Sequence, residues 1–76
     1  MSITVFAKWD PDAKVWVATS DDVPGLATEA PTTDSLRTKV EMMISELLEL
    51  NNSADGVGPT VSLAFRYEEQ RILKIA

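Results

Sequence analysis

Ser20-Asp21-Asp22-Val23-Pro24-Gly25-Leu26-Ala27-Thr28-Glu29-Ala30 is the stretch of this sequence that most constrains its fold. It follows an apolar run and precedes a helical pattern that begins at Thr32. Val23 stands before a proline and therefore favours extended backbone, and Gly25 can take the positive φ that a type II turn requires. The stretch predicts a turn and then a short strand over residues 26–30, which Pro31 ends.

Two strands joined as a hairpin are expected before this stretch. Residues 3–9 alternate as a strand does, and residues 15–20 are rich in β-branched and aromatic side chains. The segment between them, residues 10–14, contains Asp-Pro-Asp and is typical of a turn. A five-residue loop would pair the strands with Trp9 near Val15.

With this register, both faces of the hairpin would carry large apolar side chains. One face would hold Phe6 and Trp16, and the other would hold Ile3, Val5 and Val17. One helix covers only one face of a sheet, so the other face would be exposed in a monomer. Because exposed apolar patches usually mark interfaces, we expect a homodimer or a protein partner.

A helix and a last strand are expected after Pro31. The helix has Thr32 as its N-cap, and its apolar stripe is formed by Leu36, Val40, Met43, Ile44, Leu47 and Leu48. Residues 51–58 read as a loop, and residues 59–67 alternate cleanly as a strand. The apolar tail after it, with Ile72, Leu73 and Ile75, could extend this strand, form a fifth strand or cover a neighbour.

The resulting order is β-β-β-α-β, an α+β two-layer fold with one helix packed on a mainly antiparallel sheet. We expect a single domain over residues 1–76, with its core in 3–67 and an apolar tail in 68–76.

Composition restricts the function classes. The 76 residues include no cysteine and no histidine, so thiolate metal sites, disulfides and the commonest general base are excluded. A net charge of −5 disfavours direct nucleic-acid binding and favours either a basic partner or solubility alone. Neither a signal sequence nor a membrane span is recognisable, and we expect a cytoplasmic protein. We expect no cofactor, metal or small-molecule substrate.

Two pairs of carboxylates invite a catalytic interpretation. Asp10 and Asp12 lie at one end of the second strand and Asp21 and Asp22 at the other, about 15–20 Å apart at 3.3 Å per residue. The two catalytic carboxylates of a glycosidase lie about 5–10 Å apart. These aspartates are therefore better explained as turn formers, and we expect no enzyme activity.

Three segments together resemble a known family: Ala7-Lys8-Trp9-Asp10, residues 15–30, and the helix opening at Thr32. They are similar to small bacterial HicB-like proteins, in particular a stand-alone branch catalogued as a domain of unknown function. The resemblance covers residues 3–67 and implies a partial RNase H-like fold. HicB antitoxins bind and block HicA, a small basic toxin that cleaves RNA. They generally add a C-terminal DNA-binding domain, whereas this sequence stops at Ala76, so repression through DNA is not expected.

The sequence thus predicts a non-enzymatic protein-binding module, with neutralisation of a small basic HicA-like toxin as the function that the resemblance implies. The alternative is a solitary homodimeric domain with a structural or regulatory role and no toxin. Candidate partner-binding residues are Asp21, Asp22, Pro24, Gly25 and Glu29, for which the alternative is a solvated turn. Candidate interface residues are Phe6, Trp16, Ile72, Leu73 and Ile75.

Overall fold

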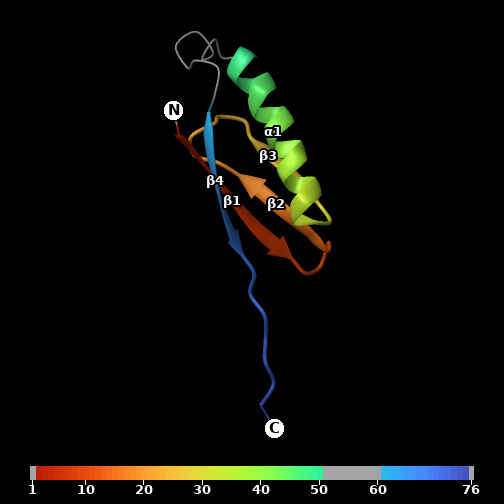
Figure 1. Cartoon of the computed structure of the whole chain (residues 1–76). Helices are drawn as coiled ribbons and strands as arrows, with labels where there is room; N and C mark the ends of the chain where they lie inside the picture. Colours follow the sequence, from red (N-terminus) through yellow and green to blue (C-terminus); the bar gives the residue numbers. More distant parts are fainter. Residues whose placement is uncertain (1, 51–60, 76) are drawn as a thin grey trace.

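The computed structural model describes residues 2–50 and 61–75 and contains four strands and one helix in those ranges (Figure 1). Their bounds are β1 Ser2–Asp10, β2 Val15–Thr19, β3 Ala27–Ala30, α1 Thr33–Leu50 and β4 Ser62–Glu68. The predicted order β-β-β-α-β is confirmed. The loop expected over residues 51–58, and the first two residues of the strand expected over 59–67, lie outside the described residues.

The four strands form one mixed sheet in the order β3-β2-β1-β4. The pairs β1–β2 and β2–β3 are antiparallel, whereas β4 runs parallel to β1 and lies at an edge of the sheet. The helix α1 packs over β2 and β3, which leaves the β4 side of the same face without a helix (Figure 1). The fold is therefore α+β, with one helix on one sheet, as expected.

The core lies between the sheet and the apolar stripe of α1. The residues Ile3, Val5 and Ala18 of the sheet are fully buried, as are Leu36 and Val40 of the helix. The predicted N-cap is also confirmed, because the Ser35 amide donates to Thr32 Oγ1 at 3.1 Å. This bond satisfies one of the free N–H groups of the first turn, so α1 begins where the sequence places it.

The register of the β1–β2 hairpin differs from the expected one by one residue. Trp9 pairs with Trp16, and the expected pairing of Trp9 near Val15 is wrong. A one-residue slip moves every side chain of a strand to the opposite face. Trp16 therefore lies on the helix side of the sheet, and Val17 lies with Phe6 on the other side.

The hairpin turn explains this register. Asp10 stays in the ladder as the partner of Val15, so the loop has four residues rather than five. The Oδ1 atom of Asp10 accepts hydrogen bonds from the amides of Asp12 and Ala13 at 3.0 and 3.2 Å. The Lys14 amide donates to the Asp10 carbonyl oxygen at 2.7 Å, and Lys14 itself takes the left-handed conformation with a φ of 58°.

Candidate protein-binding surfaces

The segment that follows β2 is fastened to β1 by side chains. Ser20 Oγ donates to the Thr4 carbonyl oxygen at 2.6 Å, and the Thr4 amide donates to Asp22 Oδ2 at 2.8 Å. The Asp22 amide in turn donates to Ser20 Oγ at 3.1 Å. The pairing of β1 with β2 ends at Phe6 and Thr19, so these side chains supply hydrogen-bond partners for the amide and the carbonyl of Thr4 in place of a strand. Asp22, a candidate partner-binding residue, thus has a structural bond in the free protein.

The Pro-Gly turn directs two apolar side chains into the core. The Leu26 amide donates to the Val23 carbonyl oxygen at 3.2 Å, and Gly25 has a φ of 89°. This is the predicted type II turn, with proline and glycine in its two central positions. Val23 and Leu26 are buried, whereas Pro24 and Gly25 are exposed. The turn therefore closes one end of the core and presents only its tip to solvent.

The remaining acidic candidates do not form one cluster. Asp21 is exposed in the segment after β2, whereas Glu29 lies on β3 as the register partner of Val17. The side chain of Lys39 is held beside β3, because its Nζ donates to the Glu29 carbonyl oxygen at 2.9 Å. Across residues 2–50 and 61–75, His, Cys, Asp and Glu side chains form no group of three or more that could hold a metal ion.

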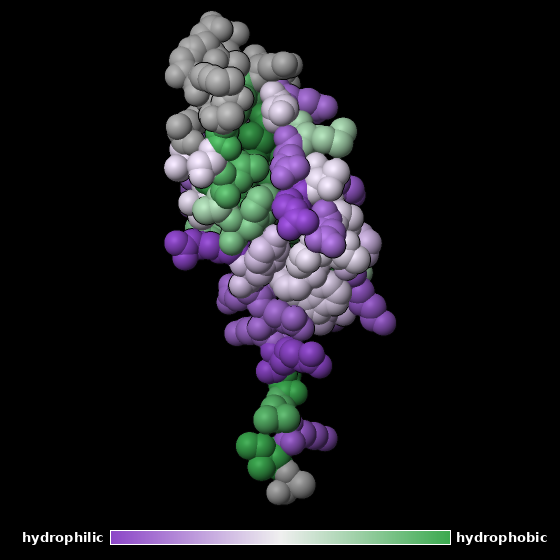
Figure 2. Space-filling model, in the orientation of Figure 1, coloured by the Kyte–Doolittle hydropathy of each residue, from purple (hydrophilic) through white to green (hydrophobic). Residues whose placement is uncertain are grey.

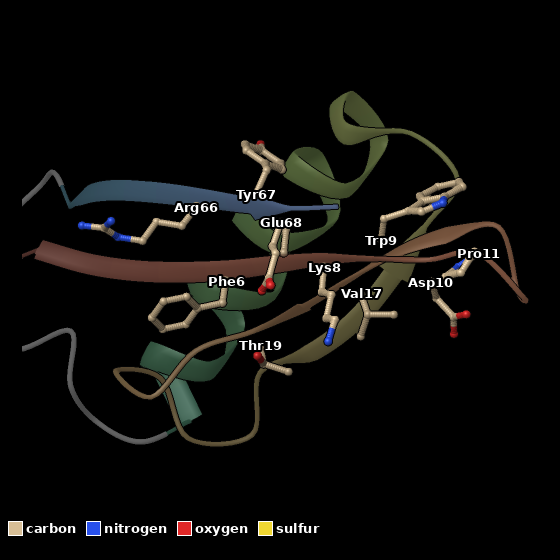
Figure 3. A pocket seen from close by; sticks show the side chains of 11 residues that line it. Phe6, Lys8, Trp9, Asp10, Pro11, Val17, Thr19, Arg66, Tyr67 and Glu68 are labelled. Carbon is tan, nitrogen blue, oxygen red and sulfur yellow. The ribbon is translucent and has the colours of Figure 1, made fainter. Parts of the chain in front are cut away.

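The sheet face opposite α1, here called the outer face, has a shallow hollow with Phe6 and Arg66 at one end, Asp10 and Pro11 at the other, and Lys8 between them (Figure 3). The hollow has a volume of about 690 Å³. Phe6 is 45% exposed, and Val17 lies in the next row of the sheet, flanked by Lys8. Further lining residues include Thr19 and Glu68. No described helix or strand covers this face, so its apolar and charged side chains are open to solvent.

On the helix side, four aromatic rings form a continuous row, here called the aromatic row. Its members are Trp9, Trp16, Tyr67 and Phe65. The ring centroids of Trp9 and Trp16 lie 5.4 Å apart, and those of Phe65 and Tyr67 lie 6.1 Å apart with nearly parallel planes. The ring of Tyr67 is 43% exposed. Because α1 packs over β2 and β3, the β4 half of this row has no helix above it.

The C-terminal tail, residues 69–75, continues the direction of β4 and leaves the body of the molecule (Figure 1). Ile72, Leu73 and Ile75 are 99%, 83% and 88% exposed. Figure 2 shows their apolar surface at the far end of the molecule, beyond a polar collar. Of the three possibilities left open by the sequence, residues 69–75 of the single chain form neither an extension of β4 nor a fifth strand, and the third, that the tail covers a neighbour, stays a prediction.

The structure brings together residues that sequence reasoning did not connect. The sequence pattern places Tyr67 and Phe65 on a strand and says no more about them. The expected hairpin register puts Val17 and Trp16 on the wrong faces of the sheet. The missing information was the parallel pairing of β4 with β1, which places Tyr67 beside Ala7 and close to Trp16. Of the candidate interface residues, Phe6 lies on the outer face and Trp16 in the aromatic row, so they belong to two different surfaces.

No helix among the described residues is long and apolar enough to cross a membrane.

Comparison with known proteins gives a family and a solved structure. The model of the family DUF1902, described as a domain of unknown function, matches residues 2–75. The crystal structure of the hypothetical protein TTHA1013 from the extremely thermophilic bacterium Thermus thermophilus is 47% identical in sequence. The match covers 99% of this chain and 100% of that chain, with a TM-score of 0.69. Comparison with curated proteins gives no match.

Proposed function

We propose that this chain, which belongs to the DUF1902 family of domains of unknown function, is a non-enzymatic module that binds another protein through its outer face. The observation that carries the proposal is the half-exposed Phe6 in an uncovered hollow of about 690 Å³. A large aromatic side chain in such a position loses contact with water when a partner fills the hollow.

The surroundings of Phe6 resemble the arrangement of a protein interface. Binding energy is usually concentrated in a few central apolar or aromatic side chains surrounded by a polar rim. Here Phe6 and Val17 are the apolar members, with Arg66 beside Phe6 and Lys8 beside Val17 as their charged neighbours in the sheet. Glu29 adds a further carboxylate in the row of Val17.

We propose a small basic protein as the partner. The net charge of −5 would speed its encounter with this chain, and exposed carboxylates such as Asp21 and Glu29 would favour its orientation. The resemblance of residues 15–30 to HicB-like antitoxins supports one identity for it, a HicA-like toxin that cleaves RNA. Such a toxin acts in the cytoplasm, which is therefore the compartment that the proposal implies.

Co-expression tests this proposal. The tagged full chain is expressed with the product of an adjacent small basic open reading frame, and the two proteins are purified together. We expect Phe6→Ser to abolish co-purification and Met42→Ser to retain it. Met42 is a matched control because it is also a large exposed apolar side chain, 62% exposed, on α1 and away from the outer face. Retention of the partner by Phe6→Ser would contradict the proposal.

A second candidate function is self-association without a toxin, in a structural or regulatory role. The side chains of Ile72, Leu73 and Ile75 favour it, because the part of the chain that the structure describes leaves them 99%, 83% and 88% exposed. The two candidates do not exclude each other, since the tail and the outer face are separate surfaces.

A further inference from the structure

We propose that residues 65–75 of two copies of this chain pair with each other as antiparallel strands, so that each tail extends the sheet of the other copy beyond β4. The inference deepens the self-association proposed above and is independent of the basic partner. It identifies the surface, the register and the symmetry axis of a homodimer.

The first argument is that β4 leaves one edge unpaired. Among the described residues β1 is its only neighbour, so a row of backbone N–H and C=O groups faces outward. Natural sheets usually protect such an edge with proline, a bulge or a covering element. The strand Ser62–Glu68 contains no proline, and no described element lies against its free side. Addition of a strand is the common way in which such an edge binds a partner.

The second argument is that the tail cannot reach this edge within its own chain. To fold back beside β4 it would need a tight turn immediately after Glu68. Residues 68–75 read Glu-Glu-Gln-Arg-Ile-Leu-Lys-Ile and contain no glycine, proline, asparagine or aspartate, the residues that form such turns. The tail instead continues straight on from β4 (Figure 1). A second copy supplies the edge that the tail of the first copy cannot reach.

The third argument concerns the alternation of side chains. Phe65 and Tyr67 lie on the helix side of β4, so a continued strand places Leu73 and Ile75 on that same side. Residues directly opposite in an antiparallel pair share a face. The apolar tail residues meet Phe65 and Tyr67 only when odd residues pair with odd residues. The two-fold axis must then pass through a residue rather than between two residues.

The fourth argument is the pairing of side chains across the axis, which favours Gln70 as the residue on the axis. With the axis at Gln70, Leu73 lies opposite Tyr67 and Ile75 opposite Phe65 of the second copy. Arg71 then lies opposite Glu69 of the second copy, and two uncharged Gln70 side chains face each other. The same register places Lys74 opposite Arg66 on the outer face, a like-charge pair that opposes the pairing. An axis at Glu68, Glu69 or Arg71 would instead place two identical charges directly opposite at the centre of the pairing, which is unfavourable.

The dimer is a closed, self-complementary assembly. Each copy gives one tail and receives one, so the same surface is used twice, as a two-fold axis requires. The two sheets join through their β4 edges into one continuous sheet with both helices on the same side. Leu73 and Ile75 extend the uncovered β4 half of the aromatic row, and the outer-face hollow around Phe6 stays available to another partner.

Cysteine cross-linking tests the axis, because the natural chain contains no cysteine. In the full-length variant Gln70→Cys, the two thiols would lie on opposed residues, whose Cα atoms are about 4.5–5.5 Å apart and within the reach of a disulfide. In the control variant Lys74→Cys, the thiol lies on the same tail, but residue 74 of one copy would lie opposite residue 66 of the other. The two thiols would then be eight residues of strand apart, about 26 Å. We expect Gln70→Cys to form disulfide-linked dimers at least about tenfold faster than Lys74→Cys at equal protein concentration. Equal rates would overturn the proposed pairing.

Sedimentation tests the dimer itself. We expect the natural chain at about 50 µM to sediment as a dimer, and Leu73→Asp to sediment as a monomer. Met42→Asp, which alters another exposed apolar side chain, should remain dimeric. Leu73 is 83% exposed in its own chain, so Leu73→Asp should remain folded as a monomer and should still unfold cooperatively on heating. A monomeric natural chain at this concentration, or a dimeric Leu73→Asp, would overturn the proposal.

Discussion

The ring of Trp16 on β2 meets the ring of Tyr67 on β4 edge-on, with centroids 5.7 Å apart, although β1 lies between the two strands. Ala7 makes this contact possible. It is the register partner of both Ala18 and Tyr67, and its methyl group is buried beneath the aromatic row. A small residue on the central strand thus allows side chains from non-adjacent strands to touch.

Enlarging Ala7 should therefore destabilise the protein. We expect Ala7→Leu to lower the free energy of unfolding by about 1–3 kcal/mol, because the added methyl groups would push Trp16 and Tyr67 apart in a packed region. Ala64→Leu is the control, since Ala64 is exposed on the outer face of β4. It should change the free energy by less than about 0.5 kcal/mol. Urea unfolding followed by tryptophan fluorescence measures both, and equal losses would contradict this role for Ala7.

The bond between Asp22 and Thr4 predicts a difference between neighbouring aspartates. We expect Asp22→Ala to lower the free energy of unfolding by about 1 kcal/mol, because the Thr4 amide loses a charged acceptor. Asp21→Ala removes the same charge one residue earlier, from an exposed side chain, and should change it by less than about 0.5 kcal/mol. Thermal unfolding of the two variants measures the difference, and a larger loss for Asp21→Ala would show that the Thr4 bond is unimportant.

The positive φ of Gly25 predicts that residues with a side chain are unfavourable at this position because of the backbone conformation. A Cβ at this position would lie 3.6 Å from Leu47 Cδ2, which is ordinary contact, so steric crowding is not the obstacle. The φ of 89° is the obstacle, and we expect Gly25→Ala to cost about 1–2 kcal/mol of unfolding free energy. Gly25→Asn should cost less, because asparagine tolerates positive φ better than alanine. Chemical denaturation of both variants tests this order, which would be reversed if side-chain volume were decisive.

Lys14 offers a stabilising substitution. Its left-handed backbone is strained for a residue with a side chain, and Lys14→Gly should relieve that strain. Glycine also costs more chain entropy on folding, which offsets part of the relief. We therefore expect the free energy of unfolding to rise by about 0.5–1 kcal/mol. Lys14→Ala keeps the strain and is the control, with no gain expected. A higher melting temperature for Lys14→Ala than for Lys14→Gly would argue against the strained turn.

Local chemistry was sufficient to predict much of the fold. The Pro24-Gly25 turn, the Thr32 cap and the stripe containing Leu36 and Val40 each depend on residues close in sequence, and the structure confirms them. The helix boundary and the element order follow from such signals, because each is decided by interactions within a few residues.

The candidate site was less predictable, because it depends on pairing between distant residues. A loop shorter by one residue exchanges the faces of Trp16 and Val17. The Asp10-Pro11-Asp12 sequence predicts a turn, but it does not say whether Asp10 belongs to the turn or to the strand. The parallel pairing of β4 with β1 joins strands separated by the helix. The contact between Tyr67 and Trp16 could therefore be found only in the structure.

Calorimetric titration of the full chain with the purified product of any small basic open reading frame encoded beside it tests the central claim, binding of a basic protein through the outer face. We expect saturable binding with a Kd of about 1 µM or tighter in about 50 mM salt, weaker binding in about 500 mM salt, and no detectable heat with Phe6→Ser. Absence of binding by the natural chain in low salt, or unchanged affinity of Phe6→Ser, would contradict it.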